Sequence, residues 1–259
     1  ELLSLSENAV FRVDTAASRP FVLRLHRPGY NTLPEMESEV VWVEALRASG
    51  VNASVPKQAL DGARYVTVRV GDELRVAGAI EWVDGEPMQD LLERDASRVA
   101  QQYRLLGSVA ARIRLQSEHW QPPTGFVRRR WDRDGLVGSN PLWGRFWEVP
   151  SLDESQRTVL VAARDELREE LGSLSTDSSE FGLIHADLHL NNVMVSGSVS
   201  VVIDFDDAGF GWYLHELAVA LHPALELPWY LEARAALLEG YEKSSALTDR
   251  ERLLLDSFV

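Results

Sequence analysis

The chain has 259 residues, 45% of them hydrophobic and 25% charged, which is typical of a globular protein and excludes a disordered one. Its net charge of −14 disfavours nucleic acid and anionic membrane surfaces as partners; it either favours a cationic substrate or only keeps the chain in solution. No cysteine is present, which excludes disulfides, thiolate metal sites and a cysteine nucleophile and is compatible with a cytoplasmic location.

The start of the chain carries no signal peptide that we recognise. The first residues, ELLSLSENAVF, lack the charged and apolar regions of a signal peptide, and no run of 18 apolar residues predicts a membrane span. The chain does not begin with Met, and its last residues, ERLLLDSFV, stop inside an apolar helical pattern. We therefore expect both ends to be truncated.

The first eighty residues predict a strand-rich region. Three short runs, LLSLS, VFRVD and FVLRLH, alternate around the turns SENA and TAASRP, and two more, ARYVTVRV and LRVAGAIEWV, flank GDE. Between these groups one helix is predicted, with Pro34 in its first turn and Gly50 as its stop. Apolar residues repeat along it at helical spacing: Met36, Val40, Val43 and Leu46.

From Gly85 onward the pattern becomes helical. Apolar residues predict a long buried helix at 97–116 and another that ends near Gly172. A short β region follows, FGLIH, NVMV and VSVVID, in which the last two runs form a hairpin through Gly197. TDRE at 248–251 fits a capping box that opens the last helix. The predicted fold is α+β, with an N-terminal β lobe at 1–83 and a helical lobe at 84–259.

The segment LIHADLHLNNVMVSGSVSVVIDFDDAG carries the candidate chemistry. It contains His185-x-Asp187-x₄-Asn192, then the hairpin, then Asp204. Phosphoryl transfer needs one carboxylate to orient the attacking hydroxyl and accept its proton, and hard oxygen ligands for Mg²⁺. A loop that supplies Asp187 and Asn192, followed by a hairpin that returns Asp204, predicts such a site.

Structural interpretations exist for each of these residues. Asp187 suits a turn, Asn192 suits a local cap, and Asp204 suits a strand end. The three residues in this order, at strand edges, favour the functional interpretation. We expect His185 to support the loop through hydrogen bonds. The sequence assigns no separate roles to His189, Asp206 and Asp207.

These motifs resemble a known superfamily. HADLHLNN followed by VIDFDDAG looks like the signature of the aminoglycoside phosphotransferase and choline kinase superfamily, whose catalytic loop commonly reads H-G-D-x-H-x-x-N. SENAVFRV, FVLRLHRPGY, MESEVVWVEAL and IDFDDAGFG resemble, more narrowly, its bacterial stress-response Ser/Thr protein kinases. The resemblance covers nearly the whole chain and implies a two-lobed, protein-kinase-like fold that binds ATP and Mg²⁺.

The resemblance implies roles for individual residues. Asp187 matches the catalytic aspartate, and Asn192 and Asp204 match the metal ligands. Glu39 takes the place of the helix glutamate, and Arg24 that of the strand lysine with which it pairs.

Two further segments match nucleotide-binding elements of the superfamily. Glu81, Trp82 and Val83 match the hinge whose backbone bonds adenine. Ser6, Glu7 and Asn8 match the turn over the phosphates, but without the glycine-rich pattern of protein kinases.

The chain departs from the superfamily pattern at two positions. Arg24 keeps the positive charge of lysine but differs in reach and geometry, and it also fits an exposed strand residue. Glu216 stands where an aspartate with a structural role is usual. The chain has two lysines in all, Lys57 and Lys243.

The function predicted from these residues is transfer of the ATP γ-phosphate to an alcohol hydroxyl. The first acceptor class is Ser or Thr on a protein; the alternatives are a small alcohol (aminoglycoside, choline or homoserine-like) and a nucleotide-binding pseudokinase. Arg24 is the only feature in favour of the pseudokinase.

Residues 117–150 are predicted to shape the acceptor site, because so long a segment without clear periodicity is often functional. They contain three consecutive arginines, Arg128–Arg130, and four tryptophans: Trp120, Trp131, Trp143 and Trp147. Tryptophan faces suit a cationic alcohol, and arginines suit an acidic or phosphorylated group. The alternative is that the tryptophans pack the segment onto its lobe and the arginines are solvated.

Overall fold

A computed structural model describes residues 1–6, 8–16 and 18–259, which pack as two compact units. The first unit comprises Glu1–Asp95, Pro122–Val127 and Leu190–Asp206, and the second comprises Ala96–Gln121, Arg128–His189 and Asp207–Val259. The boundary expected near Val83–Gly85 lies inside the first unit, which also contains the hairpin that follows the catalytic motif.

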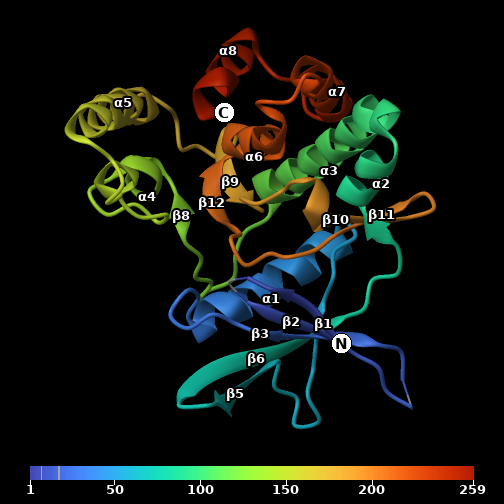
Figure 1. Ribbon diagram of the computed structural model, residues 1–259. Helices are drawn as coiled ribbons and strands as arrows, with labels where there is room; N and C mark the ends of the chain where they lie inside the picture. The colour runs from blue at the N-terminus through green and yellow to red at the C-terminus, as the bar shows by residue number, and fades with distance from the viewer. Residues whose placement is uncertain (7, 17) are drawn as a thin grey trace. The chain divides into compact units, whose positions relative to one another are not determined.

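The first unit contains an antiparallel sheet of six strands (Figure 1). The strand order is β1-β2-β3-β6-β4, and β5 also pairs with β6. The strands are β1 (Leu2–Leu5), β2 (Ala9–Val13), β3 (Phe21–Leu25), β4 (Pro56–Lys57), β5 (Tyr65–Val70) and β6 (Glu73–Glu81). The register sets Arg24 of β3 opposite Val10 on one side and Gly78 on the other. Arg24 is thus in the middle of the sheet.

Helix α1 (Leu33–Ala48) begins and ends as its sequence predicts. Thr32 and Glu35 form a capping box around Pro34, and the chain leaves the helix through Gly50, whose φ of 91° suits glycine. The apolar positions predicted at helical spacing are buried, and Trp42 between them meets Phe205 edge to face, with ring centroids 5.7 Å apart. This contact ties α1 to the segment that carries Asp204.

A second, three-stranded sheet in the first unit contains the hairpin predicted from the sequence. Its order is β11-β10-β7, from β7 (Glu86–Pro87), β10 (Val193–Ser196) and β11 (Val199–Val202). The predicted hairpin is confirmed: Ser196 pairs with Val199 across a two-residue turn in which Gly197 has φ 61°. Helix α2 (Met88–Arg94) follows β7.

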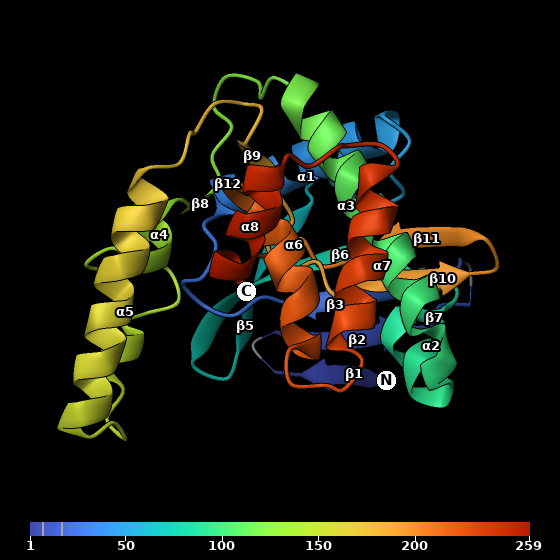
Figure 2. The ribbon, with the colours of Figure 1, turned by 90° about the horizontal axis from the view of Figure 1, so that it is seen from above.

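The second unit contains the remaining helices. They are α3 (Val99–His119), α4 (Arg133–Val137), α5 (Glu154–Gly172), α6 (Tyr213–Leu221), α7 (Tyr230–Glu242) and α8 (Asp249–Phe258). Helices α3 and α7 run side by side (Figure 2). They approach so closely that a Cβ on Gly107 would collide with the carbonyl oxygen of Leu237, and one on Gly240 with that of Arg104.

A three-stranded sheet, β8-β12-β9, lies in the second unit, and β9 leads into the loop that carries Asp187. Its strands are β8 (Arg130–Trp131), β9 (Phe181–Ile184) and β12 (Gly209–Trp212). The predicted capping box of the last helix is confirmed, because Thr248 and Glu251 exchange their hydrogen bonds at the start of α8. Within the residues described, we find no helix that is both long and apolar enough to cross a membrane.

Candidate active site

The two predicted metal ligands lie on neighbouring segments of the first unit. Asn192 ends a single 3₁₀ turn before β10, and Asp204 follows β11. The backbone N–H of Ile203 donates to the carbonyl oxygen of Asn192 at 3.0 Å, which joins the two segments one residue before Asp204. Asp204 has φ 63°, a conformation that is uncommon outside glycine and that clusters at functional sites.

Arg24 reaches the same segment from the sheet. Its Nη1 lies 2.9 Å from Oδ1 of Asp204 and 3.0 Å from Oδ1 of Asp206. Burial acts to lower the pKa of Arg24, but the carboxylates of Asp204, Asp206 and Glu39 outweigh it, so the pKa is raised. Arg24 is therefore a buried, charged residue of the site and not an exposed strand residue.

Glu39 is buried on α1 and lines the same cavity as Arg24. The ion pairs that the structure gives to Arg24 are with Asp204 and Asp206, whereas Glu39 acts on it as a nearby charge. A direct Arg24–Glu39 contact, as the resemblance implies, remains a prediction.

The hinge residues Glu81 and Val83 line a cavity of about 200 Å³ in the first unit. Its other walls are apolar side chains of the six-stranded sheet and of the segments around Asn192 and Asp204, together with the charged residues of the site. It is lined by Leu3, Val10, Val22, Arg24, Glu39, Ser54, Pro56, Ile80, Glu81, Trp82, Val83, Met194, Ile203, Asp204 and Phe205. Predicted hinge and metal residues thus share one cavity with Arg24.

The turn predicted to cover the phosphates is hydrogen-bonded to the segment that carries Asp204 and Asp206. Asn8 donates from Nδ2 to Oδ2 of Asp206 at 2.5 Å, and its Oδ1 accepts from the backbone N–H of Arg27 at 2.9 Å. The backbone N–H of Ser6 donates to the carbonyl oxygen of Asn8 at 3.3 Å. Glu7 lies outside the described residues.

The loop that carries Asp187 belongs to the second unit and is held by a buried carboxylate. Glu216 of α6 accepts the backbone N–H groups of His185 and Ala186, each at 2.8 Å. Burial raises the pKa of Glu216 to about 7, although the two backbone hydrogen bonds favour its charged form. Ala186 has φ 62°, so this contact holds a strained residue directly before Asp187.

Two histidines flank Asp187. His185 is fully buried, and its Nδ1 accepts the backbone N–H of Asp187 at 3.3 Å, in agreement with the supporting role expected for it. His189 places Nε2 at 3.3 Å from Oδ1 of Asp187. The side chain of Asp187 remains 39% exposed, so its carboxylate is accessible from solvent.

Residues 128–150 belong to the second unit, and most of their large side chains are buried or paired within it. Arg128 is buried and donates to the carbonyl oxygen of Ala208 at 2.6 Å, and Arg129 pairs with Asp207 at 3.4 Å. The expectation of solvated arginines is therefore wrong for these two; their burial also leaves them unsuited to receive an acidic segment. Arg130 is exposed and bonds Asp132.

The tryptophans of this segment differ in exposure. Trp131 and Trp147 are buried, whereas Trp143 is 59% exposed and stacks on Trp131 with ring centroids 5.7 Å apart. Trp147 packs beneath the guanidinium of Arg164, 4.6 Å from its ring centroid.

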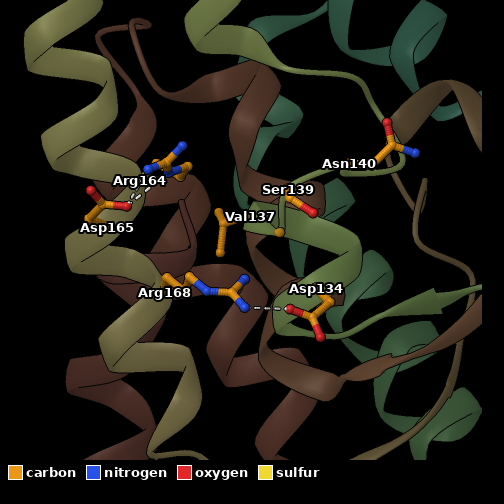
Figure 3. Close-up of a pocket in the computed structure, with 8 residues that line it drawn as sticks. Asp134, Val137, Ser139, Asn140, Arg164, Asp165 and Arg168 are labelled. Atoms are coloured by element: carbon orange, nitrogen blue, oxygen red, sulfur yellow. Dashed lines mark hydrogen bonds and ion pairs between the residues drawn. The ribbon is translucent and has the colours of Figure 1, made fainter.

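The same segment borders a polar cavity of about 640 Å³ (Figure 3). Asp134 and Arg168 face each other across it in an ion pair of 2.8 Å. Its other walls come from residues around the end of α4 and from α5: Val137, Gly138, Ser139, Asn140, Arg164 and Asp165. This cavity contains none of the predicted catalytic or metal residues.

Two residues without a role assigned from the sequence contact predicted site residues: Asp206 meets Arg24, and His189 meets Asp187. The backbone contacts of Glu216 were also not predicted. Asp206 and Asp207 are adjacent acids, and their separate roles appear only in the fold, where Asp206 meets Arg24 and Asp207 meets Arg129. The one signal available in the sequence was position, because Asp206 and Asp207 follow the motif residue Asp204 by two and three positions.

Comparisons with known proteins agree with the resemblance. A microcompartment-associated aminopropanol kinase of known structure is 33% identical, has a TM-score of 0.87, and is matched over 100% of this chain and 79% of its own. "Amicoumacin kinase" of Bacillus subtilis (strain 168) is 25% identical over 232 residues, or 88% of this chain; the chain spans 63% of that relative's length.

A solved amicoumacin kinase in complex with AMP-PNP, Ca²⁺ and Ami is 20% identical, has a TM-score of 0.82, and covers 100% of this chain and 76% of its own, a likeness of fold. The predicted α+β, kinase-like fold is confirmed. Residues 1–255 match the phosphotransferase enzyme family. The chain therefore belongs to the phosphotransferase enzyme family, as its catalytic motif predicts.

Proposed function

We propose that this protein transfers the γ-phosphate of ATP to the hydroxyl group of a small amino alcohol. The observation that carries the proposal is the cavity of the first unit, in which hinge residues, Arg24 and Asp204 line one space. An adenine-sized apolar cavity that ends in a cation and a metal-binding carboxylate suits a nucleotide and its phosphates.

The hinge supplies backbone groups for adenine. Neither backbone polar group of Val83 has a hydrogen-bond partner within the described part of the chain. The carbonyl oxygen of Glu81 accepts a long bond, 3.4 Å, from the Ser54 hydroxyl. We assign the Val83 N–H as donor and the Glu81 carbonyl as acceptor for the adenine edge, the arrangement that the superfamily resemblance implies. Polar groups at an apolar cavity wall favour a ligand that pairs with them.

Asn192 and Asp204 fit a hard divalent cation. Both offer oxygen donors, their segments are hydrogen-bonded to each other, and the Asp204 carboxylate is 36% exposed and borders the cavity. We propose Mg²⁺; the fold relative solved with AMP-PNP and Ca²⁺ is consistent with a divalent ion. When bound, the ion would neutralise phosphate charge.

Asp187 orients the acceptor hydroxyl and accepts its proton. Glu216 fixes the backbone before it, and the carboxylate is open to solvent. These are the requirements for a base that acts on an alcohol in phosphoryl transfer. Nucleotide and metal binding are thus assigned to the first unit, and proton acceptance to the second.

The acceptor class follows from the relatives and from charge. The aminopropanol kinase and the amicoumacin kinase are named for small molecules, and they give no specific support to a protein Ser/Thr acceptor. A net charge of −14 favours a cationic acceptor, as an amino alcohol is at neutral pH. The intact set of Asp187, Asn192 and Asp204 argues against a pseudokinase.

A screen of acceptors tests this proposal. Thermal shifts are measured with Mg·ATP and amino alcohols, uncharged alcohols of equal length, aminoglycosides and a Ser/Thr peptide, followed by ADP release on the hits. We expect turnover with amino alcohols and little with the uncharged analogues. Turnover on the peptide alone would replace the small acceptor by a protein, and no turnover with any acceptor would support the pseudokinase.

A further inference from the structure

We propose that Asp206 is a positioning residue of the nucleotide site, which anchors one side of the Arg24 guanidinium so that the other side stays directed at the phosphates. The inference rests on the proposed nucleotide site and adds a residue to it. Asp206 follows the metal residue Asp204 by two positions and lies, with Arg24, in the first unit.

The carboxylate of Asp206 is enclosed by polar groups from three parts of the first unit. Its side chain is 10% exposed. Oδ2 accepts from Asn8 at 2.5 Å, whereas Oδ1 lies 3.0 Å from Nη1 of Arg24 and 3.7 Å from Nδ1 of His26. Its backbone oxygen accepts from Asn31 at 3.0 Å. A buried carboxylate needs such partners, and these fix its position.

Arg24 uses one part of its guanidinium for these carboxylates. Nη1 contacts both Asp204 and Asp206, whereas Nε is buried and has no hydrogen-bond partner among the described residues. A guanidinium carries its donors in a rigid fork, so one nitrogen can stay on a carboxylate while the opposite side bonds a phosphate oxygen. The single nitrogen of a lysine cannot divide its contacts in this way.

The two aspartates that hold Arg24 differ in their surroundings. The Asp204 side chain is 36% exposed and borders the cavity, but that of Asp206 is 10% exposed, with a hydrogen bond from Asn8 at Oδ2 and an ion-pair contact with Arg24 at Oδ1. Asp204 is therefore able to turn toward a cation while Asp206 keeps Nη1 in place. Asp206 thus supports an arginine at the position where the superfamily resemblance implies a lysine, and through Asn8 it also holds the turn predicted to cover the phosphates.

The test measures ADP binding by calorimetry in EDTA and again with Mg²⁺, for the wild type and for Asp206→Asn. Loss of the anchor predicts that ADP binds about 5-fold more weakly in EDTA. Simple electrostatics predicts the opposite sign, since the variant has one negative charge fewer beside the phosphates. Unchanged or tighter binding in EDTA overturns the proposal, and so does a loss confined to the Mg²⁺ condition, because that outcome marks a metal ligand.

The matched control is Asp14→Asn, which removes the acid of an exposed Arg12–Asp14 pair at the end of β2 in the same sheet. We expect its ADP affinity to equal that of the wild type, and melting curves confirm folding of each variant. An equal loss in Asp14→Asn would show a general charge effect and overturn the assignment.

A second variant keeps the proposal testable if Asp206→Asn does not fold. Arg24→Lys alone should also weaken ADP binding in EDTA about 5-fold, because lysine has no second side to offer. In the Arg24→Lys background, Asp206→Asn should add less than about 2-fold, since the anchored group is gone. Wild-type affinity in Arg24→Lys, or equal costs of Asp206→Asn in both backgrounds, overturns the proposal.

These binding measurements need no acceptor, so they separate this inference from the proposed reaction. A wild-type protein that binds ADP but phosphorylates no alcohol would refute the acceptor proposal and leave the role of Asp206 to its own test.

Discussion

The segments that carry Asp204 and Asp187 both contain an uncommon backbone conformation, but different interactions hold it in place. Each has a non-glycine residue in the left-handed region, Asp204 at φ 63° and Ala186 at φ 62°. The Asp204 segment, in the first unit, is held by opposite charge, through Arg24. The Asp187 segment, in the second unit, is held by Glu216, which accepts backbone N–H groups and meets no cation in those contacts.

This difference has an electrostatic consequence. The carboxylates around Arg24 raise its pKa and keep it charged. Glu216 has only dipoles as partners, and burial raises its pKa to about 7. The second unit therefore contains, in Glu216, a pH-sensitive support for the loop that carries Asp187. Variants of each segment can break or sharpen this contrast.

Asp187→Asn should have the largest effect. The amide cannot accept the acceptor proton, so we expect kcat to fall by about 10³-fold or more, with nucleotide affinity within about 2-fold of wild type. ADP release and calorimetry of ADP binding measure the two quantities. Turnover within a few-fold of wild type would remove Asp187 from the reaction, and a joint loss of ADP binding would show that the residue belongs to the nucleotide site instead.

Asp204→Asn should act on the metal. Asparagine tolerates the φ of 63°, so this variant removes the charge with little strain. We expect Mg²⁺-dependent nucleotide affinity to fall more than about 10-fold, while ADP binding in EDTA changes little or improves. The metal assignment fails if Mg·ADP binds the variant as it binds the wild type.

Glu216→Gln should reduce kcat by about 10-fold and spare nucleotide affinity. Glutamine has one acceptor oxygen, so one of the two N–H groups before Asp187 loses its partner. Normal kcat in this variant would show that the loop holds its geometry without Glu216.

The same variant tests the pH contrast. The pKa of Glu216 is raised to about 7 from an ordinary value of 4.5, so the folded state binds this proton more tightly than the unfolded state. Its contribution to stability is full below pH 4.5 and is lost as pH rises through about 7. We expect the melting temperature of Glu216→Gln to fall less than that of the wild type across this range. Parallel curves would contradict the assignment.

Trp143→Ala and Trp147→Ala should have the smallest effects, one on acceptor binding and the other on stability. Trp143 is 59% exposed and offers a face for a cationic acceptor, so we expect acceptor KM to rise about 3-fold without a change in melting temperature. Trp147 is 6% exposed, and its truncation should lower the melting temperature while KM holds. If both variants change only stability, residues 128–150 are structural and the acceptor binds elsewhere.

Local signals predicted much of the fold, because they act within a few residues. Pro34, the hairpin at Gly197 and the capping box at Thr248 all have the predicted roles. Long-range pairings were not predictable: β7 at Glu86–Pro87 adds to the hairpin, and no local pattern marks a two-residue strand.

In the candidate site, too, local patterns were predictable and long-range contacts were not. Motif spacing named Asp187, Asn192 and Asp204, but the partners of Asp206 and Glu216 depend on how distant segments pack. Burial of Arg128 and of the Arg129 side chain was equally hidden, since a run of arginines usually indicates a solvated surface.

The close packing of α3 against α7 has a consequence for protein engineering. Glycine within a helix is ordinarily a target for stabilisation, since alanine is about 1 kcal/mol more favourable there. At Gly107 and Gly240 the methyl group would strike the backbone of the opposite helix, at Leu237 and Arg104 respectively. Any library that thermostabilises this enzyme by replacing helical glycines should leave these two positions untouched, because their missing side chains set the distance between the helices.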